Sequence, residues 1–231
     1  MAKLGLGYGS EFHLMRFLGR HRNDLDSLIL KEIDYQNKNI EWKDFLYDQK
    51  LEIPDREYIG IEFLKNEENY SLINDKWKDL WPSNNHAQNW DAIAKIDNEW
   101  LLIEAKAKKD EIISSSQASS DSLKKIKKEM DKLKKDYYIK SSNDWTKKYY
   151  QKANRILFFN FLKENNIQAK LVFVYFISGY LKNGIQEGVV SRNEWLSIIK
   201  EQDAYLGIQD NHLLKKHIVN VFIDVYGNNN L

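Results

Sequence analysis

The chain has 231 residues, which suits one large domain, and its 35 basic and 34 acidic side chains leave a formal net charge of +1. This balance argues against nonspecific coating of DNA as the main role, although it permits a local basic surface. The absence of cysteine excludes disulfides, thiolate metal sites and cysteine nucleophiles, and it fits a cytoplasmic protein. No stretch approaches the roughly eighteen apolar residues of a membrane span, and no signal-peptide pattern opens the chain.

The first eighty residues predict helices and one strand. Ser10 is a candidate N-cap for a helix over 11–20, and Glu11 falls within the apolar stripe of that helix. A carboxylate directed at a core needs a positive partner or a metal ion, whereas an acid in the first turn also complements the helix dipole. Both explanations stay open for Glu11. The other elements expected here are a helix over 23–33, a strand over 40–47 and a helix over 71–80 that ends before Pro82.

The stretch from Trp90 to Ala107 predicts a β-hairpin around an Asp97-Asn98 turn, because Asx residues tolerate the positive φ of a tight turn. A two-residue loop pairs residue 96 with residue 99 and places Asp91 opposite Glu104. Lys106, two residues further on, shares the face of Glu104. The opposite face is then apolar and consists of Ala92, Ala94, Ile96, Leu101, Ile103 and Ala105.

The polar face of this hairpin carries two carboxylates and one ammonium group. Opposed carboxylates are unfavourable unless something neutralises them, and oxygen ligands suit Mg²⁺. A cross-strand ion pair on a wetted sheet face is the alternative explanation.

The chain after the hairpin predicts four more helices and two strands. Serine-rich residues 114–120 indicate a loop, either a linker or a mobile flap. The helix that follows has polar faces dominated by lysine, including Lys124 and Lys128, and both a solvated face and a nucleic-acid track fit this pattern. The expected elements are helices over 120–139 and 144–165, a buried strand over 171–177, a helix from the capping box at 191–194 to about 200, a short helix near 210–217 and a strand over 219–226.

The order of these elements predicts an α/β fold, in which a mixed β-sheet is flanked by helices. The arrangement of Asp91, twelve intervening residues and then Glu104-x-Lys106 resembles the core signature of the PD-(D/E)XK nuclease superfamily. Trp90 stands where the family usually has proline. The resemblance implies a restriction-endonuclease-like fold with extra helices. It also implies a single domain over 1–231, with a core at about 10–177 and a C-terminal helix-strand extension at 188–227.

The resemblance also implies an activity. It predicts a nuclease, endo- or exonucleolytic, that depends on Mg²⁺ or Mn²⁺, and DNA rather than RNA is the expected substrate. Asp91 and Glu104 would bind the metal ion with help from Glu11, and Lys106 would position the attacking water. The candidate substrate contacts are Gln88, Gln151, Arg155, Lys124 and Lys128.

One further family feature is altered. The family's Gln-xxx-Tyr spacing, on the helix after the lysine strand, is replaced by Tyr149-Tyr150-Gln151. Two alternatives remain open: a catalytically inactive protein of the same fold that binds nucleic acid or protein, and an unrelated α/β protein.

Overall fold

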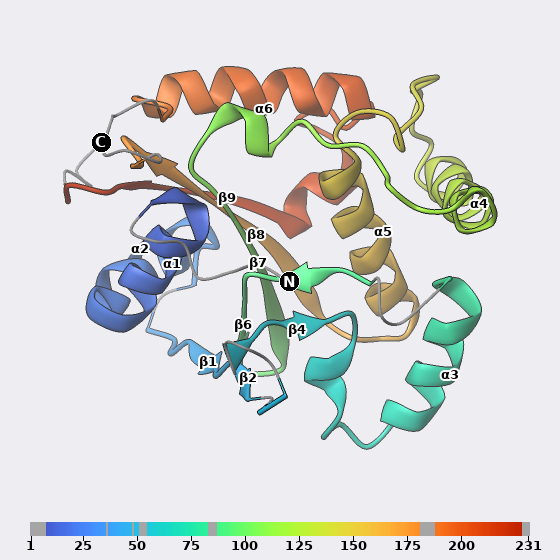
Figure 1. The fold of residues 1–231 in the computed structure, drawn as a ribbon, viewed down its shortest axis with the longest axis horizontal. Helices are drawn as coiled ribbons and strands as arrows, with labels where there is room; N and C mark the ends of the chain where they lie inside the picture. Colours follow the sequence, from blue (N-terminus) through green and yellow to red (C-terminus); the bar gives the residue numbers. More distant parts are fainter. Residues whose placement is uncertain are drawn as a thin grey trace.

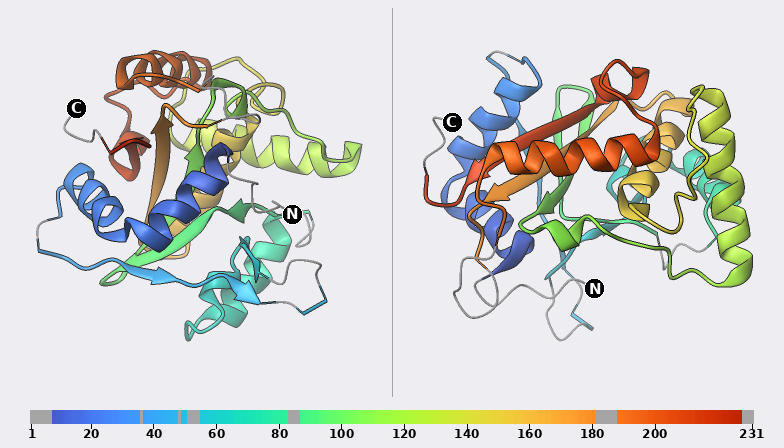
Figure 2. Two further views of the ribbon diagram at one scale, coloured as in Figure 1. Left: turned by 60° about the vertical axis from the view of Figure 1, so that its left-hand side comes forward. Right: turned by 90° about the horizontal axis from the view of Figure 1, so that it is seen from above.

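A computed structural model of the protein describes residues 8–35, 37–47, 49–50, 55–82, 87–180 and 188–227, and the statements below concern these residues. Figure 1 and Figure 2 show a central β-sheet with helices on both of its faces. The expected mixed α/β architecture is therefore confirmed. Among the described helices, none has the length and apolar character needed to cross a membrane.

The elements follow the expected order, with several short additions. The α-helices are α1 (Gly9–Arg20), α2 (Arg22–Glu32), α3 (Tyr70–Leu80), α4 (Ser120–Asp136), α5 (Tyr150–Glu164) and α6 (Arg192–Leu206). The strands are β1 (Glu41–Lys43), β2 (Leu46–Tyr47), β3 (Asp55–Arg56), β4 (Tyr58–Ile59), β5 (Asn89–Trp90), β6 (Ala92–Ile96), β7 (Glu99–Lys106), β8 (Ala169–Ile177) and β9 (Ile218–Asp224). The 3₁₀ helices are η1 (Glu62–Leu64), η3 (Lys109–Glu111) and η4 (Leu213–His217).

The main sheet has five strands in the order β1-β6-β7-β8-β9. β1, β6 and β7 form an antiparallel meander, whereas β7, β8 and β9 run parallel. Parallel neighbours need a crossover connection, which α4 and α5 supply before β8 and α6 supplies before β9. β7 is therefore the central strand, with a hydrogen-bonded neighbour on each side.

Each face of the sheet packs against its own group of helices. α1 and α2 cover the face that carries the hairpin residues expected to be apolar, Ala92, Ala94, Ile96, Leu101, Ile103 and Ala105. Helices α3 to α6 contribute to the core on the other face, around Ile93, Trp100, Leu102, Phe173 and Tyr175. Because both faces are covered, an ionisable side chain near the middle of β7 loses most of its contact with water.

The hairpin has the predicted turn and register. Asp97 adopts a positive φ of 51° in the turn, and Ile96 pairs with Glu99. The ladder between β6 and β7 continues as far as the pair Ala92–Ile103. Position 91 comes directly before this pair, and the same register places it opposite position 104.

Two expected helix starts are wrong. α1 begins at Gly9 with Tyr8 as its N-cap, so Ser10 lies inside the helix. α5 begins six residues later than expected, at Tyr150. Its N-cap Tyr149 has a φ of 57°, in the left-handed region that a right-handed helix does not include.

The strand expected over 40–47 is divided into β1 and β2, which belong to different sheets. β2 pairs with β3, and β4 pairs with β5, in two separate two-stranded ladders. The β4–β5 ladder leads directly into the hairpin, so β4 lies beside the start of the hairpin.

Candidate active site

The predicted catalytic side chains gather around β7. Glu104 and Lys106 project from this strand and are 2% and 8% exposed. They lie on the face covered by α5, which contributes the buried Arg155. Asp91 enters from the single residue between β5 and β6, where it is partly buried. The hairpin register and the position of α5 therefore bring four ionisable groups together.

Glu104 is bound by two cations. Its Oε1 atom pairs with the ammonium group of Lys106. Its Oε2 atom accepts a hydrogen bond of 2.8 Å from Nε of Arg155, and Nη2 of the same guanidinium lies 2.7 Å from this oxygen in an ion pair. Burial alone would raise the pKa of Glu104, but the charges of Arg155 and Lys106 outweigh burial, and the pKa is lowered. Glu104 is therefore an ionised carboxylate, and each of its oxygens accepts a hydrogen bond from a cationic side chain.

Lys106 remains an ammonium ion. Burial would lower its pKa, but the charges of Glu104 and Asp91 and the hydrogen bond to Glu104 raise it instead. A lysine in this state donates protons in hydrogen bonds and stabilises negative charge, whereas a general base would need the neutral amine.

Asp91 lies next to β7 and is bonded to the backbone of this strand. Its Oδ2 atom accepts a hydrogen bond of 2.6 Å from the amide of Ala105. Burial, followed by the charge of Glu104, raises the pKa of Asp91 to about 7. The site thus contains too little positive charge to keep all of its carboxylates ionised.

Glu57 is a third carboxylate at this site, and the sequence analysis missed it. β4 pairs with β5 through Tyr58–Trp90 and Ile59–Asn89, and this register continued by one residue places Glu57 opposite Asp91. Burial, followed by the charges of Asp91, Glu11 and Glu104, raises the pKa of Glu57 to about 8. Only the long-range pairing of two-residue strands brings Glu57 here, and no local pattern around residue 57 indicates it.

Glu11 lies at the edge of this group. It occupies the first turn of α1, where burial raises its pKa, and its charge is among those that raise the pKa of Glu57. The structure therefore brings Glu11 towards the carboxylates, although α1 packs against the opposite face of the sheet from α5.

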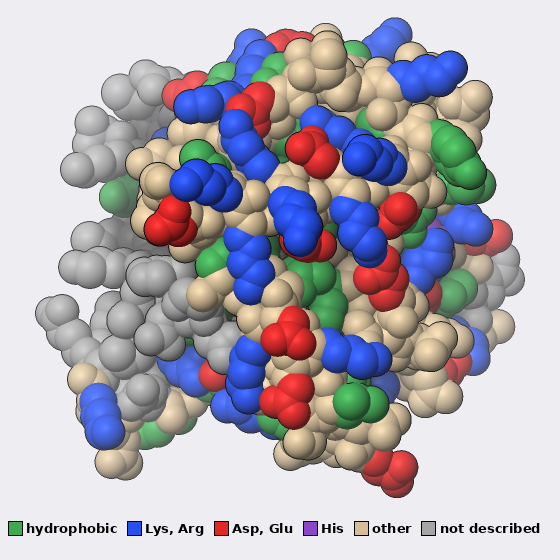
Figure 3. Space-filling model, turned by 90° about the vertical axis from the view of Figure 1, so that its right-hand side faces the viewer, with side chains coloured by type: hydrophobic (Ala, Val, Ile, Leu, Met, Phe, Trp, Pro, Cys, Tyr) green, Lys and Arg blue, Asp and Glu red, His purple; other side chains and the backbone are tan. Residues whose placement is uncertain are grey.

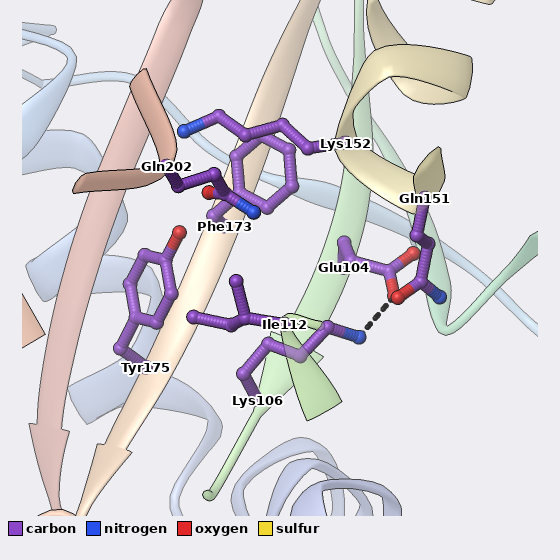
Figure 4. A pocket seen from close by; sticks show the side chains of 8 residues that line it. All are labelled: Glu104, Lys106, Ile112, Gln151, Lys152, Phe173, Tyr175 and Gln202. Atoms are coloured by element: carbon purple, nitrogen blue, oxygen red, sulfur yellow. Dashed lines mark hydrogen bonds and ion pairs between the residues drawn. The ribbon is translucent and has the colours of Figure 1, made fainter. Parts of the chain in front are cut away.

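Gln151 also borders the site. It lies in the first turn of α5 and lines a cavity of about 10 Å³ together with Glu104 and Lys106 (Figure 4). This volume is close to the smallest that holds one water molecule. Gln202 lines the other end of the cavity, and its buried Oε1 atom has no hydrogen-bond partner in the described part of the chain.

The remaining candidate substrate contacts are Gln88, Lys124 and Lys128. Gln88 is buried and donates a hydrogen bond from Nε2 to Asn154 of α5. Lys124 and Lys128 are exposed on α4, at the right-hand edge of the molecule in Figure 1.

The lysine-rich surface of α4 is partly neutralised. Figure 3 shows basic side chains spread over this side of the molecule with acidic side chains among them. Lys124 pairs with Asp121 at 3.3 Å, Lys127 with Asp144 at 2.6 Å, and Lys132 with both Asp136 and Glu164. Such exposed pairs contribute little stability, but they reduce the attraction of this surface for a phosphate backbone.

The donor atoms of the site fit a divalent cation in type, because Mg²⁺ takes carboxylate oxygens. Their arrangement does not fit it directly. In the described ranges of the chain, no three Asp, Glu, His or Cys side chains lie close enough to share one metal ion. Each oxygen of Glu104 faces a cation of the protein, so a divalent ion that binds this carboxylate is repelled by Lys106 and Arg155 unless one of them moves away.

No family model matches the chain, and neither a curated protein nor a solved structure matches it. The case for a function therefore depends on the geometry and charges of the site itself.

Proposed function

We propose that this protein is a metal-dependent phosphodiesterase that acts on DNA. The observation that carries the proposal is the hairpin register, which sets Asp91 beside Glu104 and Lys106 at a buried position on β7. The order α1, β1, β6, β7, α5, β8 supports it, because the resemblance to the PD-(D/E)XK superfamily implies a core of helix, three strands, helix and strand.

The protein's own groups have distinct tasks in this proposal. Asp91, Glu104 and Glu57 supply negative oxygens, and a bound Mg²⁺ would lower the pKa of a water molecule and offset charge on the phosphate. Lys106, kept protonated by its carboxylate neighbours, orients this water and stabilises the extra negative charge of the pentacovalent transition state.

A binding module without catalysis is the second candidate, and one observation favours it. The charge of Glu104 is already neutralised by its ion pairs with Arg155 and Lys106, and such an arrangement is also found in ion clusters with a purely structural role. Binding to a divalent cation separates the two candidates, since a structural cluster needs none.

The first experiment is thermal unfolding with and without millimolar Mn²⁺. The wild type should be stabilised, by about 2.7 kcal/mol when Mn²⁺ is at a hundred times its Kd, and Asp91→Ala should not. Asp75→Ala is the matched control, because Asp75 is an exposed partner of Lys78, and it should respond like the wild type.

The second experiment is DNA cleavage by Lys106→Met, which keeps the aliphatic stem and removes the charge. This variant should retain the Mn²⁺-dependent stabilisation and lose cleavage. Cleavage at the wild-type rate would remove Lys106 from the mechanism. Absence of both the Mn²⁺ response and cleavage in the wild type would favour the binding module.

A further inference from the structure

Arg155 has more attachments than a simple ion pair requires. Besides Glu104, its Nη2 atom donates a hydrogen bond of 2.7 Å to the carbonyl oxygen of Asn89. Its guanidinium carbon lies 4.7 Å from the centre of the Trp90 ring, at cation–π distance. Asn89 and Trp90 form β5, which directly precedes Asp91. Arg155 is therefore attached to the site independently of Glu104.

A divalent cation that binds Glu104 is repelled by the two cations already on this carboxylate, so the release of one of them favours its binding. Lys106 stays beside this carboxylate, because it projects from the same strand two residues away and is also attracted by Asp91. Arg155 reaches Glu104 from another element, at the end of a long side chain. The arginine is therefore the partner that can leave Glu104 and still keep contacts at the site, with the Asn89 carbonyl and the Trp90 ring.

A displaced Arg155 would stay at the site. Its contacts with the Asn89 carbonyl and the Trp90 ring do not involve Glu104, and no hydrogen bond from its Nη1 atom is found within the described residues. The donors released from Glu104 would be free for another anion. A guanidinium group binds phosphate oxygens in a bidentate manner, which a lysine ammonium does not match.

We propose that Arg155 is an internal counter-ion that a divalent cation displaces from Glu104, and that the displaced guanidinium then binds a phosphate oxygen of the nucleic acid. This inference rests on the proposed function and assigns Arg155 two successive partners. It predicts opposite effects of one substitution: loss of Arg155 strengthens cation binding and weakens cleavage.

The test uses the folded full-length protein with Arg155→Met, which keeps the bulk and removes the charge. Isothermal titration should show Mn²⁺ binding about tenfold tighter than in the wild type, which corresponds to about 1.4 kcal/mol. DNA cleavage at saturating Mn²⁺ should fall by about a hundredfold, the scale of losing one donor to a reacting phosphate. If Arg155→Met does not fold, Arg155→Gln is the second neutral variant.

The matched control is Lys152→Met on the same helix. Lys152 is also buried and lines the same small cavity, but its ion pair is with Asp203, at 2.7 Å. Its replacement should leave the Mn²⁺ affinity at the wild-type value. Tighter Mn²⁺ binding in this variant too would overturn the local explanation.

The other outcomes are distinct. Unchanged or weaker Mn²⁺ binding by Arg155→Met, with binding by the wild type, would overturn the displacement while the proposed function stands. Tighter binding with undiminished cleavage would overturn the phosphate contact. Absence of Mn²⁺ binding in every variant would overturn both this inference and the metal-dependent function.

Discussion

At the scale of single residues, the site is an unequal balance of charge. Three carboxylates lie on neighbouring segments of the chain, while the two cations, Lys106 and Arg155, are both bonded to Glu104. The raised pKa values of Asp91, about 7, and Glu57, about 8, follow from burial and then from this inequality. Such a site gains from an added positive charge, and this supports a search for a bound cation.

Glu57→Gln tests whether the third carboxylate takes part. The raised pKa leaves Glu57 mostly protonated at neutral pH, so the uncharged amide should leave the stability of the metal-free protein close to that of the wild type. The loss of a carboxylate ligand should lower the Mn²⁺ affinity about tenfold, or by about 1.4 kcal/mol. Isothermal titration and urea unfolding give the two values. Glu67→Gln is the control, because Glu67 is exposed and pairs with Lys95 at 2.9 Å. Equal Mn²⁺ affinity in Glu57→Gln and the wild type would remove Glu57 from the site.

His217 should contribute to the loss of stability in acid. It packs against Phe159 with ring centres 4.8 Å apart, and its Nε2 atom is buried without a partner in the described residues. Burial, followed by the charges of Lys216, Lys163 and Lys170, lowers its pKa to about 4. In the unfolded chain the imidazole of His217 takes up a proton near pH 6.5, whereas in the folded protein it does so only near pH 4. Between these pH values the unfolded state therefore binds more protons than the folded state, and the stability of the protein falls as the pH falls.

His217→Phe should therefore reduce the stability lost between pH 7 and pH 5. The reduction should be about 1 kcal/mol, which allows for the partial exposure of His217. Urea unfolding of the variant and the wild type at both pH values measures it. The same loss in both proteins would show that His217 titrates alike in the folded and unfolded states.

The sequence predicted Asp91, Glu104 and Lys106 together because a tight hairpin is a local structure, and its register fixes which residues share a face. Glu57 escaped prediction because its place depends on pairing with a segment more than thirty residues away. The bond between Arg155 and Glu104 escaped for the same reason, since it depends on how α5 packs against β7.

At the scale of elements, the start of a helix could be predicted from the sequence where a hydrogen bond between nearby residues marks it. The Ser191 hydroxyl accepts a hydrogen bond of 3.2 Å from the backbone amide of Glu194. The Glu194 carboxylate accepts one of 3.1 Å from the backbone amide of Val190. This is the predicted start of α6. The start of α5 was missed because a tyrosine rarely adopts a left-handed conformation, and the packing around Tyr149 selects it.

Ser191→Ala should destabilise the protein by about 1 kcal/mol, the usual cost of losing an N-cap hydrogen bond. Ser119→Ala is a matched control, because Ser119 occupies the N-cap position of α4 and its side chain makes no capping bond there. Its effect should be well below that of Ser191→Ala. Chemical denaturation of both variants gives the comparison, and equal effects would show that the hydroxyl of Ser191 contributes nothing as a cap.

At the scale of the whole molecule, the fold class could be predicted because the order of helical and strand patterns restricts the sheet to few arrangements. The sequence did not indicate the ion pairs that connect α5, α6 and η4. Asp203 of α6 binds Lys152 of α5 through Oδ1 and Lys215 of η4 through Oδ2. This buried cluster links the helix that carries Arg155 to the segment before β9.

Asp203→Ala tests this link, because it leaves two lysines without their shared carboxylate. Lys152 and Asp203 are 3% and 4% exposed, so the variant should lose about 3–5 kcal/mol of stability. Lys152→Met removes one of the two lysine charges that lose this carboxylate. The double variant Asp203→Ala, Lys152→Met should therefore be more stable than Asp203→Ala alone, and a double-mutant cycle from urea unfolding gives the interaction energy. Additive effects of the two substitutions would show that Lys152 and Asp203 do not stabilise each other.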